Sequence, residues 1–259
     1  FQSNQLIQIT GDLAFSDIEN FNVYGGLALA SITGIVVIGG LKRIAEVASY
    51  LVPFMGSVYF GAMLIAIFLN LELVVPAFKL IFIDAFNGTA IAGGTFIGVL
   101  IYGVRRGAFS NEAGMGTESL VHGVAKVSNP VKQGLVAMTG PIFDTLIICT
   151  ATALIILISG VWETSTSQGV TLTSEAFNLL LGDLGGFILF ACVICFGLST
   201  IFTYSYYGAT CARFIFGSFG MNFYIYLYII GIFIYSIVPI DIAINIADGA
   251  FAMMAIPTL

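Results

Sequence analysis

The sequence contains very little charge. Of its 259 residues, 8% are Asp, Glu, Lys or Arg, whereas 59% are hydrophobic. A soluble domain carries about 25% charged residues, because its surface faces water. The scarcity excludes a soluble globular protein, and with it a disordered chain or a nucleic-acid-binding surface, which need polar or cationic residues. The class that remains is an all-α, polytopic membrane protein.

Cysteine is also rare. The four cysteines lie in apolar stretches, which argues against a disulfide framework. Cys192 and Cys195 form a CxxC pattern, but their neighbours are Ala, Ile, Phe and Val. We therefore interpret both as small packing residues rather than as a redox or metal motif.

Both ends of the sequence are unusual for a complete protein. The sequence begins with Phe1 instead of Met and stops inside an apolar run at residues 253–259. The stretch before residue 21 contains Asp12, Asp17 and Glu19 but neither Lys nor Arg, the reverse of the basic start of a signal peptide. We expect a fragment that is truncated at both ends and has no cleavable signal.

Long apolar runs fill most of the chain. A run of about 20 residues is long enough to cross the hydrocarbon core of a membrane as a helix. We expect about seven such membrane segments, in a single transmembrane domain over residues 1–259. Their approximate bounds are 21–41, 51–71, 90–126, 134–161, 184–216, 222–239 and the start of another at 240–259.

The few charged residues orient these segments. Lys42 and Arg43 fall in one loop, and Lys126 and Lys132 in another, so the positive-inside rule places both loops in the cytoplasm. The loop at residues 162–183 contains three acidic residues and no Lys or Arg. We expect this loop outside.

The run at residues 90–126 must make one net crossing, because the loops before and after it are already oriented. A straight helix of this length would reach about 55 Å, which is too long for one crossing. Each charge in the middle of a membrane costs about 2.5 kcal/mol or more. We therefore expect a helix that is broken around residues 103–116, with its unwound backbone facing a watery cavity. The polar residues inside the run are Arg105, Arg106, Asn111, Glu112 and Glu118.

A broken helix near the middle of the membrane is typical of secondary transporters. Unwound carbonyls can coordinate a cation there, and the ends of the half-helices attract charged groups of a solute. The glycines of residues 107–116 allow a ligand to approach the backbone closely, while Ser110 and Asn111 offer neutral donors and acceptors. The residues thus predict a site for a small polar or anionic solute.

The same segment resembles a known family. RGAFSNEAGMGT, at residues 106–117, closely resembles the signature of the alanine or glycine:cation symporters, also called sodium:alanine symporters. The resemblance continues in one order and spacing along most of the chain. Further matching stretches are 39–45, 51–55, His122, 125–126, 129–131, 133–138, 143–147, 198–201 and 205–208.

Members of that family are similar to LeuT-fold transporters, which contain two inverted five-helix repeats with a broken first and sixth helix. The resemblance implies that residues 90–126 are the sixth helix, and that the chain runs from the end of the third helix into the tenth. The first helix, which supplies half of the substrate site in this fold, would then be missing. We expect the fragment alone not to transport.

The resemblance also implies which residues bind ligands. No cofactor is implied, and Na⁺ is the coupling ion. Tyr204 stands where the family usually has Trp, which keeps an aromatic wall and adds a hydroxyl. The implied substrate-binding residues are Gln2, Gly107, Phe109, Ser110, Asn111, Gly114 and Tyr204, with Gly107, Gly114 and Gly116 setting the break. The implied sodium ligands are Ser199, Thr200, Asp144 and Thr145.

On this basis we expect sodium-coupled symport of a small neutral amino acid, alanine or glycine, by alternating access. The implied location is the plasma membrane, as a multi-pass protein of a prokaryotic inner membrane, and no enzymatic activity is expected. Coupling to protons is an alternative, for which Glu118 and Asp144 are the candidate groups. A passive channel would need a continuous polar stripe along several helices, whereas polarity concentrates here at one break.

Several of these residues have simpler explanations. The Ser199 and Thr200 hydroxyls could bond back to the carbonyl four residues earlier, as is common in membrane helices. Asp144 could cap the start of the seventh helix. Arg105 and Arg106 could bind the substrate carboxylate, but we expect a structural partner, Glu112 or Glu118.

An enzyme is the remaining alternative. Ser119 lies three residues before His122, the only histidine, so the two could form the dyad of an intramembrane hydrolase. The sequence lacks a GxSxG-like elbow. His122 also lies near the predicted cytoplasmic surface rather than the middle of the membrane, which argues against this reading.

Overall fold

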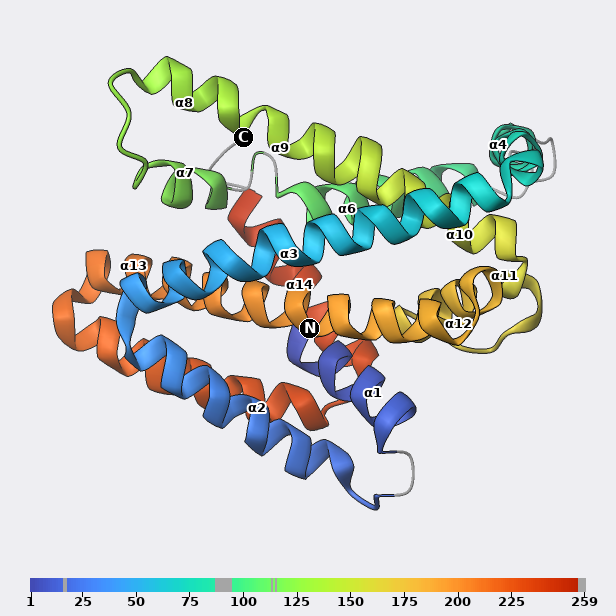
Figure 1. The fold of residues 1–259 in the computed structure, drawn as a ribbon. Coiled ribbons are helices and arrows are strands. Elements are labelled where there is room, and N and C mark those ends of the chain that lie inside the picture. Colours follow the sequence, from blue (N-terminus) through green and yellow to red (C-terminus); the bar gives the residue numbers. More distant parts are fainter. Residues whose placement is uncertain (16–17, 87–94, 113, 115, 256–259) are drawn as a thin grey trace. The chain divides into compact units, whose positions relative to one another are not determined.

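A computed structural model describes the whole chain except residues 16–17, 87–94, 113, 115 and 256–259. The described residues form helices and turns, and none of them lies in a strand. They divide into two compact units (Figure 1). Unit 1 contains residues 1–62 and 167–247, and unit 2 contains residues 63–166 together with the chain from residue 248 onward.

Unit 1 is built around one long helix. Helix α13 packs against α2, α1 and α12, and Figure 1 shows α2 alongside the end of α13. Its apolar core brings together residues from both ends of the chain, including Leu6, Leu29, Ile201, Phe202 and Ile232. The helices are α1 (Gln2–Ala14), α2 (Phe21–Ile38), the first part of α3 (Gly40–Leu69), α12 (Val170–Leu181), α13 (Asp183–Ile237) and the start of α14 (Ile240–Ala255).

Helix α13 is long enough to contain two membrane segments. Its 55 residues are interrupted at Gly217, where φ is 69° and ψ is −159°. Only glycine adopts such a conformation at little cost, since it has no Cβ. The two apolar runs predicted at 184–216 and 222–239 are thus the two parts of α13.

The polar face of α1 fastens the ends of other helices in unit 1. The side-chain amide of Asn4 donates to the carbonyls of Tyr235 (3.2 Å) and Val238 (2.6 Å), at the end of α13. The Gln5 side-chain oxygen accepts a hydrogen bond from the backbone N–H of Val170, the first residue of α12. Backbone groups at helix ends lack partners inside the helix, so these buried amides stabilise the ends.

Unit 2 contains the segment that carries the predicted site. Within it, η1 packs against α6, and α10 packs against η1 and α4. The elements are the end of α3, α4 (Leu71–Ala85), α6 (Thr95–Asn111), α7 (Thr117–His122), α8 (Pro130–Ala137), α9 (Thr139–Pro141), the π-helix η1 (Ile142–Cys149), α10 (Thr150–Ser159), α11 (Val161–Thr164) and the end of α14.

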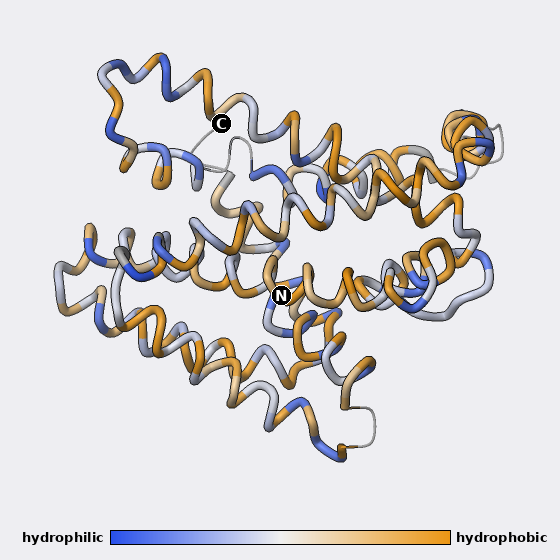
Figure 2. The backbone as a smooth tube through the Cα atoms, in the orientation of Figure 1, coloured by the Kyte–Doolittle hydropathy of each residue, from blue (hydrophilic) through white to orange (hydrophobic). Residues whose placement is uncertain are grey.

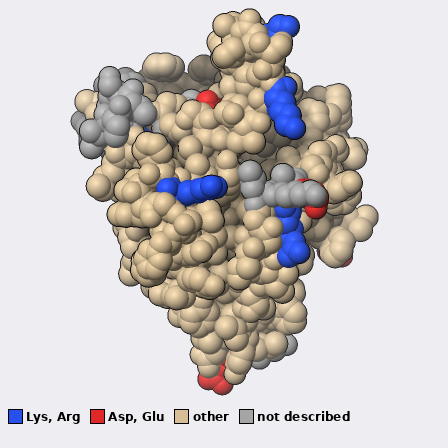
Figure 3. Space-filling view, turned by 90° about the vertical axis from the view of Figure 1, so that its left-hand side faces the viewer, with Lys and Arg blue, Asp and Glu red and all other residues tan. Residues whose placement is uncertain are grey.

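The helices have the composition of membrane spans. Four stretches of the described chain are long and apolar enough to cross a membrane: Phe21–Ile38, Glu46–Leu69, Pro130–Ser159 and Asp183–Ile237. Figure 2 shows long hydrophobic stretches along α2, α3 and α13. On the face drawn in Figure 3, charged side chains are few and scattered. An apolar exterior of this kind suits hydrocarbon rather than water, which is consistent with a polytopic helical membrane protein.

Three stretches are helical where the sequence predicted none. The predicted loop with Lys42 and Arg43 lies inside α3, and the predicted loop at residues 162–183 contains α12. Residues 72–85, which belonged to no predicted segment, are part of α4. Helix α12 is only 12 residues long, too short to cross a membrane, yet it buries Ala176 and Phe177 in unit 1. Charged residues interrupt the apolar pattern of α4, which hid it from a search for long runs.

Candidate functional site

The chain breaks between α6 and α7. Helix α6 ends at Asn111, and the backbone then turns through Glu112, Gly114 and Gly116, where φ is 54°, 79° and 82°. Helix α7 begins directly afterwards, at Thr117. Ala113 and Met115, and the start of the predicted run at residues 90–94, lie outside the described residues.

The break is shorter than the sequence predicted. Gly103 and Gly107 lie inside α6, so Gly107 does not help to set the break, contrary to the prediction. A Cβ added at Gly107 would have no atom within 4 Å among the described residues. Glycine weakens a helix without ending it, because the neighbouring residues still propagate the hydrogen bonds. The left-handed backbone at Gly114 and Gly116 is what interrupts the helix.

Five side chains from α6 and η1 meet next to this break. Ser110 Oγ donates to Asp144 Oδ2 at 2.6 Å, and the Asn111 amide donates to Thr145 Oγ1 at 3.1 Å. Thr145 Oγ1 in turn lies 3.2 Å from Asp144 Oδ2, to which it donates. Cys149 Sγ is 3.3 Å from Ser110 Oγ. We refer to these five residues as the α6–η1 cluster.

The π-helical geometry of η1 makes this cluster possible. Asp144 and Cys149 are five residues apart, and both lie beside the Ser110 hydroxyl. In an α-helix, residues five apart point about 140° away from each other, whereas in a π-helix they share a face. Pro141 directly precedes η1 and has no N–H to donate, so the regular hydrogen-bond pattern is interrupted at that point.

Asp144 does not cap a helix. The helical stretch Pro130–Ser159 is continuous, and its N-cap is Asn129, whose side chain accepts a 2.9 Å bond from the Val131 N–H. Asp144 therefore lies well inside a membrane span, half-buried, with two hydroxyl donors on one carboxylate oxygen. The capping alternative is wrong, and a carboxylate at this depth is a functional candidate.

A cation on α6, one turn before Ser110, contacts two aromatic rings of the same helix. The Arg106 guanidinium carbon is 5.2 Å from the centre of the Tyr102 ring and 5.6 Å from that of the Phe109 ring. The Phe109 ring meets Phe251 of α14 edge to face, with the centres 4.7 Å apart. Contacts of this kind with a guanidinium stabilise by about 0.5–2 kcal/mol each.

The structural partner of the two arginines is not the one that the sequence predicted. Asp248 of α14 forms ion pairs with Arg106 and, at 3.9 Å, with Arg105. Glu112 and Glu118, the expected partners, are close in sequence, whereas Asp248 is 142 residues beyond Arg106. The choice of partner follows from how α14 packs on α6, which no local pattern reveals.

The other predicted ligands lie in unit 1. Gln2 is the first residue of α1, and Tyr204 lies on α13 with its ring 5.3 Å from that of Tyr207. The Ser199 and Thr200 hydroxyls both donate to the Phe196 carbonyl, at 2.9 Å. Back-bonding, the simpler explanation of these two hydroxyls, is therefore present.

Ser119 and His122 have other partners. Ser119 Oγ donates to the Gly116 carbonyl at 2.7 Å, and His122 Nδ1 lies 2.7 Å from the Gln133 side-chain amide. A nucleophile needs its proton directed to a base. Because Ser119 donates to the Gly116 carbonyl and His122 contacts the Gln133 amide, the two side chains do not form the pair that a hydrolase needs.

Sequence reasoning missed Cys149, Asp248 and Phe251. A signal for Asp248 was available, because it is an acid within a predicted membrane segment, and such residues are expensive unless they have a function or a partner. Cys149 is a neighbour of Ser110 only because of the π-helix, so its position in the sequence gave no indication. Among the described residues, no group of three or more His, Cys, Asp or Glu could hold a metal ion.

Comparison with known proteins gives a consistent result. Residues 1–259 match the sodium:alanine symporter family. The chain is 35% identical to the sodium/alanine symporter AgcS of Methanococcus maripaludis, over 96% of this chain and 56% of that protein. It is 35% identical to the uncharacterized transporter YflA of Bacillus subtilis (95% and 54%), and 33% identical to the probable sodium/glutamine symporter GlnT of the same species (99% and 54%). The chain spans about half the length of the curated relatives it matches.

Proposed function

Because the chain belongs to the sodium:alanine symporter family, we propose that its protein couples inward movement of Na⁺ to uptake of a small neutral amino acid, alanine or glycine. The observation that carries the proposal is the α6–η1 cluster, where a carboxylate and neutral donors meet beside a broken helix. The activity is that of the whole protein, of which the chain spans part.

The cluster has the chemistry of a sodium site. The Asp144 carboxylate and the hydroxyls of Ser110 and Thr145 are hard oxygen ligands, which suit hard cations. A bound Na⁺ neutralises the half-buried carboxylate, and the hydroxyl hydrogens then turn away while their oxygens coordinate. The C-terminal end of α6, close by, carries a partial negative charge that also favours a cation.

The same end of α6 can bind an amino acid. The Asn111 amide offers donors and an acceptor, and the Phe109 ring forms an apolar wall against Phe251. Gly114 has the left-handed backbone of an exposed turn, where a ligand can approach the main chain. The family resemblance also implies Gln2, Gly107 and Tyr204 as substrate-binding residues, and we propose them on that ground alone.

Ser199 and Thr200 are proposed as ligands of a further sodium ion. Their hydrogens are directed at the Phe196 carbonyl, so their oxygen lone pairs face away from that bond. Hydroxyls in this arrangement can coordinate a cation without giving up their own hydrogen bonds.

The broken α6–α7 segment supports a LeuT-like inverted-repeat fold, in which it is the sixth helix of a single transmembrane domain of about seven segments. Bacterial and archaeal relatives support a prokaryotic inner membrane as the location. Alternating access around the break would then expose the site to either side.

Sodium helps because its charge offsets the substrate carboxylate in a low-dielectric cavity. Each ligand should therefore bind more tightly when the other is present, and the two coupling factors must be equal.

The test is uptake by the full-length protein in proteoliposomes. Labelled alanine should accumulate with an inward Na⁺ gradient, and uptake should collapse when K⁺ or choline replaces Na⁺. Asn111→Ala should abolish uptake in protein that is still folded. Asn70→Ala is the matched control, because the Asn70 amide donates to the Ala66 carbonyl of its own helix and lies outside the cluster.

Proton coupling is the alternative that this experiment separates. Uptake that survives without Na⁺ but follows a proton gradient would overturn the sodium proposal. In that case Asp144→Asn should make uptake independent of pH. Under sodium coupling the same variant should instead raise the Na⁺ concentration needed for half-maximal uptake.

A further inference from the structure

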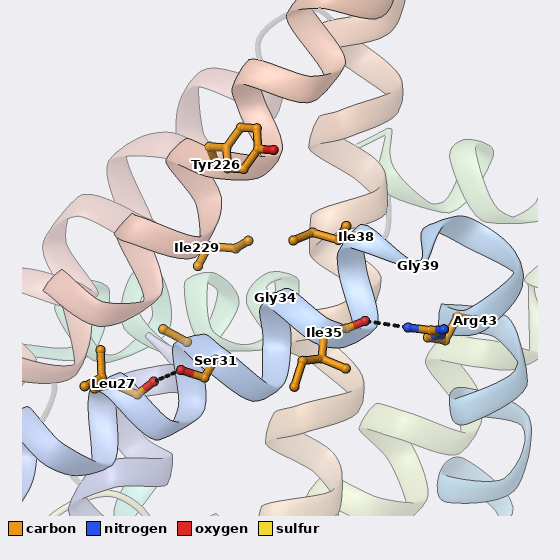
Figure 4. Close-up of a pocket in the computed structure, with 10 residues that line it drawn as sticks. Leu27, Ser31, Gly34, Ile35, Ile38, Gly39, Arg43, Tyr226 and Ile229 are labelled. Carbon is orange, nitrogen blue, oxygen red and sulfur yellow. Dashed lines mark hydrogen bonds between the residues drawn. The ribbon is translucent and has the colours of Figure 1, made fainter.

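An apolar groove lies on unit 1 between α2 and the last part of α13. It has a volume of about 680 Å³. Figure 4 shows Ile38 of α2 and Ile229 of α13 pointing toward each other, and Ile35 and Tyr226 also line the groove. Both helices are long and apolar enough to cross a membrane, so we expect the groove to face the hydrocarbon of the bilayer.

Small residues of α2 create the groove. Gly34 lines the groove, and a Cβ at this position would be in van der Waals contact with the Ile229 side chain, 3.5 Å away. Ser31 also lines it, but its hydroxyl donates to the Leu27 carbonyl at 2.8 Å, which leaves the wall apolar. From Leu27 to Ile38 the groove follows α2 for about 17 Å. This is the shape of a binding site for an extended chain of methylene groups.

One end of the groove carries a fixed positive charge. Arg43 Nη1 donates to the Ile35 carbonyl at 2.8 Å, as the dashed line in Figure 4 shows. The side chain lies over Gly39, where a Cβ would be 2.6 Å from Arg43 Nε, so glycine makes room for it. Arg43 is exposed, and among the described residues no carboxylate is within ion-pair distance of it. A guanidinium has five N–H donors, which leaves several for a ligand.

We propose that this groove binds one acyl chain of an anionic glycerophospholipid, whose phosphate is held by Arg43. The pairing of an apolar groove with a cation at one end matches the two parts of such a lipid. Arginine binds phosphate oxygens through parallel N–H bonds, and basic residues at the edge of a membrane attract anionic lipids. Arg43 lies in the first turn of α3, next to the connection from α2, and the positive-inside rule places this basic end of the two helices at the cytoplasmic surface.

The test is native mass spectrometry of the full-length protein in mild detergent, after incubation with phosphatidylglycerol or with zwitterionic phosphatidylcholine. The unmodified protein should retain more phosphatidylglycerol than phosphatidylcholine. Arg43→Gln should reduce that retention roughly fivefold, as expected for one basic residue. Arg213→Gln is the matched control, since Arg213 is an exposed arginine of α13 outside the groove.

A second variant tests the apolar part. Gly34→Leu should fill the groove and reduce retention of both lipids, whereas Gly231→Leu adds the same bulk outside the groove, where no described atom lies within 4 Å of a Cβ. Because Arg43 is exposed, the Arg43→Gln result is decisive even where Gly34→Leu fails to fold.

Two results would overturn the proposal. If Arg43→Gln and Arg213→Gln reduce the retention of phosphatidylglycerol equally, the lipid binds through the overall charge of the protein and not through Arg43. Unchanged lipid retention in Gly34→Leu, together with altered stability or self-association, would mean that another part of the full-length protein or a second copy covers the groove.

Discussion

At the scale of single residues, Asp144 is the centre of the α6–η1 cluster. Two hydroxyls, those of Ser110 and Thr145, donate to the same carboxylate oxygen, and the Asn111 amide donates to Thr145. Hydrogen bonds to a charged group are worth about 1.5–3 kcal/mol, more than those between neutral groups. The charge of Asp144 therefore orients the polar side chains that the sequence assigned to substrate and to sodium.

The Ser110 hydroxyl should matter for sodium rather than for folding. Ser110→Ala removes the 2.6 Å bond to Asp144 and one proposed oxygen ligand. We expect the Na⁺ concentration for half-maximal alanine uptake to rise about tenfold or more, measured in proteoliposomes of the full-length protein. Ser49→Ala is the control, because the exposed Ser49 hydroxyl bonds to the Glu46 carbonyl of its own helix. An unchanged sodium dependence in Ser110→Ala would contradict the assignment.

At the scale of elements, the broken α6–α7 segment and the π-helix η1 form the candidate site together. The break ends α6 directly after Ser110 and Asn111, and η1 brings Asp144 and Cys149 onto one face opposite them. Neither feature is regular α-helix. Irregular helical geometry of this kind is frequent at functional sites, because it frees backbone groups and places side chains that a regular helix would separate.

The glycines of the α6–α7 segment should not be equivalent. Gly107→Ala should leave folding intact or raise stability by about 0.5–1 kcal/mol, since alanine favours a helix. Gly116→Ala should cost about 1–2 kcal/mol, because its φ of 82° is left-handed. Thermal unfolding of the purified full-length protein measures both. Equal effects of the two substitutions would show that the break includes Gly107, as the sequence had suggested.

A single-residue deletion should be tolerated in η1 but not in α10. Deleting the exposed Leu146 makes Asp144 and Cys149 i,i+4 neighbours, which share a face in a regular α-helix. Deleting the exposed Ala153 instead rotates the residues on one side by about 100° and moves the buried Leu154 and Ile155 out of place. The two deletion variants are compared by the yield and the gel-filtration profile of the purified protein. A Leu146 deletion that aggregates like the Ala153 deletion would contradict the role of the π-helix.

At the scale of the whole molecule, each unit is assembled from segments far apart in sequence. Unit 1 joins residues 1–62 to 167–247, and unit 2 adds the chain from residue 248 to residues 63–166. In unit 2 the Arg106–Asp248 ion pair links α6 to α14. The Asp248 side chain is only 15% exposed, so the pair lies largely out of solvent.

Replacing one partner of this ion pair should destabilise the protein more than replacing both. Asp248→Asn leaves the Arg106 charge without its partner and should cost about 3–5 kcal/mol. The double variant Arg106→Gln with Asp248→Asn should recover part of that loss. A double-mutant cycle by thermal unfolding in detergent measures the interaction.

Asp241→Asn is the control for this cycle, because Asp241 is an exposed acid in the first turn of α14. Additive effects of Arg106→Gln and Asp248→Asn would mean that the two side chains do not stabilise each other.

The sequence by itself determined the class of protein and predicted where the candidate site lies. Scarce charge predicted membrane helices, and the polar residues around Ser110 predicted a break, because both depend on composition and spacing along a short stretch. Only the tertiary structure decided the partners. It placed Asp144 beside Ser110, paired Arg106 with Asp248, and ended α6 beyond Gly107. These contacts join residues far apart in the chain or depend on the backbone angle at one residue, and both are set by how helices pack rather than by any local pattern.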